Sequence, residues 1–233
     1  MSEHQYIESV RAALTPLADG ARAPAMRAYM KDQFDFLGIA SPVRRAAIAA
    51  LPTWKPDRSA LLAVVGALWT LPGREYRYTA IDLLWKHRAR LGVDDIAYLL
   101  ELAQVDAWWD SVDGLAKVVG GILRTAAKTN PHAQQTMDAA LVHASMWVRR
   151  IAMLHQLGWR LDTDERRLFD AARALAHEKE FFVRKAIGWA LRDYARWQPV
   201  AIQTFLHEQG AMLSALTRRE AGKHLASLLL RAT

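Results

Sequence analysis

The sequence contains no cysteine among its 233 residues. Without a thiol the protein has no disulfide scaffold, no thiolate metal site and no cysteine nucleophile, and it is not a zinc deaminase. It also lacks a long hydrophobic run, because the longest uncharged apolar stretch, residues 60–71, is too short to cross a bilayer. Residues 1–4 show neither a basic region nor an apolar one, so we expect a cytoplasmic protein rather than a secreted or membrane protein.

Acidic residues are fewer than basic ones, 24 against 31, which gives a formal net charge of +7. This excess is typical of proteins that bind nucleic acid, although a solvated basic surface with no such partner would give the same sum. Hydrophobic residues make up 52% of the chain and charged residues 24%. That composition indicates a sizeable buried core, and it excludes disordered, collagen-like and low-complexity proteins.

No stretch of the sequence alternates between apolar and polar residues for long enough to predict a strand. Apolar residues recur at helical spacing along nearly the whole chain, so we predict an all-α fold. Helix starts are predicted at Asn130-Pro131, at the acidic segment 162–165 and after Asp94-Asp95. Short polar links are predicted at residues 51–53, 71–73, 90–92 and 197–199.

A five-residue pattern recurs along the chain: an apolar residue, an arginine, two variable residues, and a small or apolar residue. It occurs at residues 43–47, 76–80, 148–152 and 183–187, and less well at 112–116 and 217–221. The last positions of these segments are 33 to 36 residues apart, a period typical of a solenoid with two helices per repeat. We predict an α-solenoid of about six repeats, from about residue 25 to 228, in a single domain over residues 1–233. A helical bundle with chance matches is the alternative.

The second position of this pattern forms a column of five arginines and one aspartate. Its members are Arg44, Arg77, Asp113, Arg149, Arg184 and Arg218. Guanidinium groups in equivalent places of a concave face suit the phosphates of a nucleic-acid strand, so we predict that the five arginines, together with Lys185, bind DNA. The alternative is that each arginine binds an acid or a carbonyl of the next repeat and meets no ligand.

The aspartate of the column, Asp113, lies four residues after Trp109, so both side chains project from one helix face. We assign Trp108 to the core. Trp189 could bring a second indole from another repeat, with Arg150 reaching in between. Such a pocket suits a cationic substrate attached to a phosphate backbone. The sequence has no glycine-rich phosphate loop and no His-Glu-x-x-His pair, so we expect neither a cofactor nor a metal.

Several segments closely resemble the AlkD family of HEAT-like-repeat DNA glycosylases. These are RAYMK (27–31), FLGI (36–39), WWDSVD (108–113), EFFVRKAIGWALR (180–192) and RREAGKH (218–224), so the resemblance covers roughly residues 25–225. It implies a bacterial, nucleoid-associated monomer whose HEAT-like repeats hold duplex DNA in a concave face. It also implies hydrolysis of the N-glycosidic bond of N3- and N7-alkylated purines, of the 3-methyladenine and 7-methylguanine type, without a base pocket.

The resemblance also assigns roles to individual residues. It implies a catalytic acid at Asp113, two indoles at Trp109 and Trp189, a phosphate-binding arginine at Arg150 and a DNA-contacting tyrosine at Tyr29. We assign no lysine of the pocket as a nucleophile that would form a Schiff base. We therefore expect a monofunctional enzyme without strand cleavage. The alternative is a non-catalytic HEAT-like module that binds DNA structures or protein partners, against which the presence of Asp113 and both indoles argues.

Two observations disagree about the arginine of the site. The repeat column selects Arg149, whereas the family's Trp-x-x-Arg spacing, counted from Trp147, selects Arg150. We favour Arg150. Residues 1–24 match none of the motifs of this family, so the sequence does not indicate their role.

Overall fold

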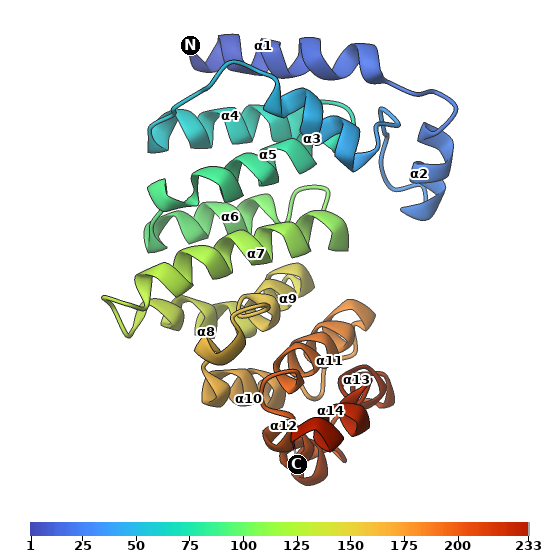
Figure 1. Ribbon diagram of the computed structural model, residues 1–233, viewed down its shortest axis with the longest axis vertical. Coiled ribbons are helices and arrows are strands. Elements are labelled where there is room, and N and C mark those ends of the chain that lie inside the picture. The colour runs from blue at the N-terminus through green and yellow to red at the C-terminus, as the bar shows by residue number, and fades with distance from the viewer. Residues whose placement is uncertain (233) are drawn as a thin grey trace. The chain divides into compact units, whose positions relative to one another are not determined.

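The computed structural model describes residues 1–232. These residues form fourteen α-helices and five short 3-10 helices, with no β-strand among them (Figure 1). The predicted all-α class is therefore confirmed for the described residues, and the arrangement is consistent with an α-solenoid-type fold. Over the same residues, no helix is both long and apolar enough to span a membrane.

The chain divides into two compact units, Met1–Leu91 and Gly92–Thr233. The first contains α1 (Glu3–Leu14), α2 (Ala23–Tyr29), α3 (Ser41–Ala49), α4 (Arg58–Thr70) and α5 (Arg74–His87). The second contains α6 (Ile96–Leu102), α7 (Trp109–Ala126), α8 (Thr136–Leu141), α9 (Met146–Leu154), α10 (Glu165–Ala174), α11 (Phe181–Ala195), α12 (Pro199–Gln209), α13 (Ala215–Ala221) and α14 (Leu225–Ala232). The single domain over residues 1–233 stays a prediction.

In the first unit, α1 packs against α3 and α4, and α4 packs against α5. Leu61, Val64 and Leu68 recur along α4 at helical spacing, and all three are fully buried. The apolar stretch of residues 60–71 is therefore a core helix of the unit, as its length suggests.

A buried carboxylate organises the connection between α2 and α3. Glu75, at the start of α5, is fully buried and accepts hydrogen bonds from the backbone N–H groups of Leu37, Gly38 and Ile39 at 2.9, 2.9 and 3.0 Å. Gly38 has a φ of +86°, and a Cβ there would lie 2.1 Å from the carbonyl oxygen of Asp19. Glycine is therefore required at this position.

In the second unit, α9 packs against α7, α8 and α11, while α11 also packs against α12 and α13. Two glycines allow neighbouring helices to approach closely. A Cβ on Gly120 of α7 would lie 1.9 Å from the carbonyl oxygen of His155, and a Cβ on Gly188 of α11 would lie 2.5 Å from the Cβ of Glu220. The backbones of α7 and α11 are consequently fixed against the elements that carry the site.

The predicted helix starts are correct in part. Asp164 caps α10 by accepting a hydrogen bond from the backbone N–H of Arg167 at 3.0 Å. The prediction at Asn130 is wrong: its side chain accepts a hydrogen bond from the backbone N–H of His132, two residues on, and α8 begins only at Thr136. The local turn made by the asparagine competes with a helix start at that position.

Candidate active site

The acid of the arginine column, Asp113 on α7, binds a guanidinium from α9. Arg150 of α9 donates from Nε to Oδ1 of Asp113 at 2.7 Å and from Nη2 to Oδ2 at 2.8 Å. The Arg150 side chain is 1% exposed, and that of Asp113 is 26% exposed. The guanidinium therefore holds the carboxylate from the interior side, and the carboxylate stays within reach of solvent.

Cζ of Arg150 lies 5.9 Å from the ring centroid of Phe182, which forms a cluster with the rings of Trp108 and Trp147. Their ring centroids are 5.1 to 5.9 Å apart. Nη1 of Arg150 also donates to the carbonyl oxygen of Phe182. Because the Arg150 side chain is almost completely buried, its hydrogen bonds to Asp113 are stronger than they would be in solvent.

The environment of Asp113 acts on its pKa in two directions. Burial raises the pKa of this carboxyl above its ordinary value, and the nearby charge of Asp110 adds to the increase. The hydrogen bonds and the positive charge of Arg150 act against burial but do not outweigh it. Asp113 is therefore a better proton acceptor than a solvated aspartate.

The two candidate indoles lie on either side of this ion pair in sequence. Trp109 is the first residue of α7, one turn before Asp113 on the same helix face, and it is half-buried. Trp189 of α11 is also half-buried, and the centroid of its ring lies 5.3 Å from Cζ of Arg150. Arg150 thus contacts both Asp113 and Trp189. Its place between the indoles of Trp109 and Trp189 stays a prediction.

A residue that the sequence did not single out completes the surroundings of Trp189. Glu220 of α13 is buried, and one of its oxygens, Oε2, accepts a hydrogen bond from Nε1 of Trp189 at 3.3 Å. Lys185, one turn before Trp189 on α11, places its Nζ 5.4 Å from the ring centroid. The segment RREAGKH contains Glu220, but nothing in the sequence shows that this glutamate is buried.

Four arginines of the column bind backbone carbonyl groups close to the end of the helix that precedes their own, and we call them the carbonyl clamps. Each guanidinium reaches back to a carbonyl that the preceding helix or its following turn leaves without a partner. The bonds are Arg77 to Trp69 (3.0 Å), Arg149 to His143 and Ala144 (2.7 and 2.8 Å), Arg184 to Glu178 (2.6 Å) and Arg218 to Gly210 and Leu213 (both 2.8 Å).

The fifth arginine of the column, Arg44 on α3, binds two side chains of α5 instead. Its side chain is 4% exposed and donates to Oδ2 of Asp82 at 2.7 Å and to Oγ1 of Thr79 at 3.1 Å. Arg149 also pairs with Glu178, at 2.7 Å. Arg44 and Arg149 thus bind acids that follow them in the chain, whereas the carbonyl groups bound by the four clamps precede their arginines. DNA contact stays a prediction for all five arginines.

Tyr29 lies at the end of α2 in the first unit and is 70% exposed. Its DNA contact, which the family resemblance implies, stays a prediction. Arg150 has a different placement, because a phosphate could reach its guanidinium only if the covering side chains moved. Its geometry favours a role in holding Asp113.

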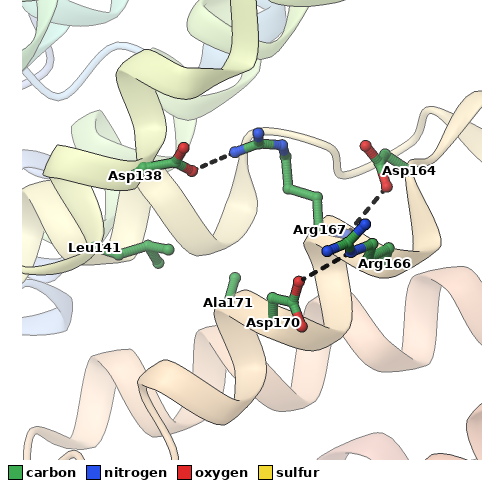
Figure 2. Close-up of a pocket in the computed structure, with 7 residues that line it drawn as sticks. All are labelled: Asp138, Leu141, Asp164, Arg166, Arg167, Asp170 and Ala171. Carbon is green, nitrogen blue, oxygen red and sulfur yellow. Dashed lines mark hydrogen bonds and ion pairs between the residues drawn. The ribbon is translucent and has the colours of Figure 1, made fainter. Parts of the chain in front are cut away.

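A cavity of about 320 Å³ lies beside α8 and α10, and Figure 2 shows its lining. Arg167 pairs there with Asp138, and Arg166 pairs with Asp170 at 3.7 Å. The lining contains no residue of the candidate site, and it carries three carboxylates and two guanidinium groups. Within residues 1–232, no group of three or more His, Asp or Glu side chains is placed to hold a metal ion.

Comparison with known proteins bears on the chemistry of this arrangement. Residues 10–225 match the family described as DNA alkylation repair enzyme. The chain is also similar to a solved structure, "Predicted DNA alkylation repair enzyme from Enterococcus faecalis", with 32% sequence identity and a TM-score of 0.81 over 89% of this chain and 96% of that one. No curated protein matches the sequence. The segment matched by the family includes Asp113, Arg150, Trp189 and Glu220.

Proposed function

The chain belongs to the family of DNA alkylation repair enzymes, and from this premise we propose that it is a DNA glycosylase acting on duplex DNA. Its substrates are purines alkylated at N3 or N7, and it hydrolyses the bond between the purine and the deoxyribose. The observation that carries this proposal is the carboxylate of Asp113, fixed by a buried arginine and open to solvent on its other side.

The chemistry of an alkylated purine matches a site that contains a fixed carboxylate and no general acid. Alkylation at N3 or N7 gives the base a positive charge, so it leaves as a neutral molecule and takes the bonding electron pair with it. The sugar becomes an oxocarbenium-like cation, which the carboxylate of Asp113 stabilises. A water molecule then bonds to C1′, and its proton passes to Asp113 and on to solvent.

Arg150 and the indoles have supporting roles in this mechanism. Arg150 holds the Asp113 carboxylate in one orientation, so no reorganisation is needed as the sugar cation forms. Trp109 and Trp189 present ring faces that attract the developing charge. Only cationic lesions benefit from this arrangement, and bulky adducts are accepted because no pocket has to enclose the base.

DNA binding follows from the basic surface and the repeats. About six HEAT-like repeats form a concave face that holds the duplex, and its backbone is contacted by groups such as the exposed Tyr29 and the half-buried Lys185. The enzyme acts as a monomer and leaves an intact strand with an abasic site. Lys185 lies near Trp189, and a lysine at the site could form an imine with the sugar and cleave the strand. Strand cleavage is therefore measured together with base release.

The test is release of 7-methylguanine from a duplex under single-turnover conditions, with strand cleavage measured before and after alkali. Wild type should release the base and leave the strand intact until alkali is added. Asp113→Asn should abolish release and keep duplex affinity within about threefold, because the amide keeps the shape and removes the charge.

Asp94→Asn is the matched control, since Asp94 is an exposed acid of the same unit. It should behave as wild type. Near-normal release by Asp113→Asn would remove this residue from the mechanism. Tight duplex binding without release by wild type would instead indicate a non-catalytic binding module.

A further inference from the structure

The carboxylate of Glu220 is buried among cations at the surface where α11 meets α13. Its side chain is 6% exposed. Nη1 of Arg192 donates to Oε2 at 2.9 Å, and Nζ of Lys223 lies 3.0 Å from Oε1 and 3.2 Å from Oε2. Lys185 adds a third positive charge nearby. A buried carboxylate with this number of partners is held in one place.

The protonation state of this carboxylate follows from its partners. Burial raises the pKa of Glu220, but the hydrogen bond from Lys223 and the charges of Lys185, Lys223 and Arg192 together lower it below its ordinary value. Glu220 is therefore ionised at neutral pH. It offers a strong, permanently charged hydrogen-bond acceptor to any donor that faces it.

The remaining donor on this carboxylate is the indole N–H of Trp189, at 3.3 Å from Oε2. A half-buried indole can rotate about its side-chain bonds, and a single hydrogen bond at Nε1 is enough to select one ring orientation. The neighbouring Gly188 makes the contact possible, because a Cβ there would lie 2.5 Å from the Cβ of Glu220. The two helices therefore approach closely at the residue that precedes the indole.

We infer that Glu220 is a positioning residue for base excision, which fixes the indole of Trp189 so that its ring face is presented to the deoxyribose at Asp113. This inference rests on the proposed glycosylase function. Glu220 itself touches no substrate. It acts through Trp189, and Arg192 and Lys223 act in turn by holding Glu220.

The kinetic test is a double-mutant cycle on release of 7-methylguanine. Glu220→Ala and Trp189→Phe should each slow release per folded molecule by about tenfold, a factor that corresponds to about 1.4 kcal/mol. The double variant should be no slower than either single variant, because both changes remove the same hydrogen bond. Glu220→Gln keeps an acceptor oxygen and should stay within about threefold of wild type.

A second readout does not depend on activity. The indole ¹H–¹⁵N resonance of Trp189, identified by its loss in Trp189→Phe, should shift and exchange faster with solvent in Glu220→Ala. It should be nearly unchanged in Glu220→Gln. Glu208→Ala is the matched control, since Glu208 is an exposed acid of the neighbouring helix α12, and it should alter neither the resonance nor the rate.

The possible outcomes separate this inference from the proposed function. An unchanged Trp189 resonance in Glu220→Ala, or rate losses that multiply in the double variant, would overturn the positioning role. A Glu220→Gln variant as slow as Glu220→Ala would also overturn it. If wild type releases no purine while the resonance shifts as expected, the glycosylase proposal fails and the contact between Glu220 and Trp189 stands.

Discussion

Arg150 donates two hydrogen bonds to Asp113, one to each carboxylate oxygen, at 2.7 and 2.8 Å. The two residues come from α7 and α9 of the second unit, and the arginine is the more deeply buried partner. An ion pair of this kind contributes little net stability, because desolvation offsets the Coulomb attraction. What it does supply is one fixed orientation for the carboxylate.

Arg150→Ala should therefore reduce the rate of base release rather than DNA affinity. We expect release per folded molecule to fall by about 10- to 100-fold, while the salt dependence of duplex binding stays the same. Arg150→Lys should not restore the rate, because an ammonium group cannot bind both oxygens side by side. If Arg150→Ala instead lowers the salt slope by about 0.9, with normal release from bound DNA, the arginine contacts a phosphate.

The pH dependence of base release should report the ionisation of Asp113. Since its pKa lies above the ordinary 3.8, release should decline as pH falls through that raised pKa, at a higher pH than for a solvated aspartate. Removing the positive charge in Arg150→Ala should move this decline to still higher pH. Single-turnover rates between pH 4 and 8 measure both effects. If the rate of Arg150→Ala declines at the same pH as that of wild type, the decline does not report the ionisation of Asp113.

Trp109→Ala and Trp189→Ala distinguish a site role from a core role. For half-buried indoles at the site, release should slow by about tenfold, equivalent to roughly 1 to 2 kcal/mol, with a small change in melting temperature. Truncating a fully buried tryptophan would cost about 3 to 5 kcal/mol of stability instead. Trp69→Ala provides that control, since Trp69 is 1% exposed. If Trp109→Ala and Trp189→Ala greatly lower the melting temperature but release the base at a normal rate, both indoles are core residues with no role at the site.

Much of this arrangement could be predicted from the sequence because it depends on local periodicity. Helical spacing predicts the all-α fold, and a separation of four residues places Trp109 and Asp113 on one face. The spacing from Trp147 selects Arg150, and the structure places that residue beside Asp113. The first two inferences need only the geometry of one helix. The choice of Arg150 rests on the spacing that the family resemblance implies, because the repeat column selects Arg149.

Other features could not be predicted because they depend on contacts between elements. The carbonyl clamps have no sequence signature, since any backbone carbonyl can accept their hydrogen bonds. Glu220 looks like a surface residue until the close approach of α11 and α13 at Gly188 buries it. The turn at Asn130 differs from a helix start only in which backbone N–H its side chain binds.

Stability should decline in mildly acidic solution because of His155. Burial lowers the pKa of this histidine from 6.5 to about 4, so the folded protein keeps it neutral. Below pH 6.5 the unfolded chain binds a proton that the folded protein does not, and the free energy of unfolding should fall by roughly 3 kcal/mol between pH 6.5 and 4. Urea unfolding across this range measures the loss. In His155→Leu the part of this loss that His155 causes should disappear. If the free energy of unfolding of that variant falls equally steeply, other groups cause the loss.

The last prediction concerns the carbonyl clamps. Arg149 donates to the carbonyl groups of two exposed residues and pairs with the half-buried Glu178, so Arg149→Ala removes three hydrogen bonds. We expect it to lower the free energy of unfolding by about 1 to 3 kcal/mol and to leave the salt dependence of DNA binding unchanged.

Arg166→Ala is the matched control for Arg149→Ala, because it removes the same charge from a side chain that is 93% exposed and makes one ion pair at 3.7 Å. Its effect on stability should be within about 0.5 kcal/mol. If Arg149→Ala instead has the stability of this control and lowers the salt slope by about 0.9, its guanidinium binds a phosphate. In that case the column arginines line the DNA-binding face, and their carbonyl contacts are secondary.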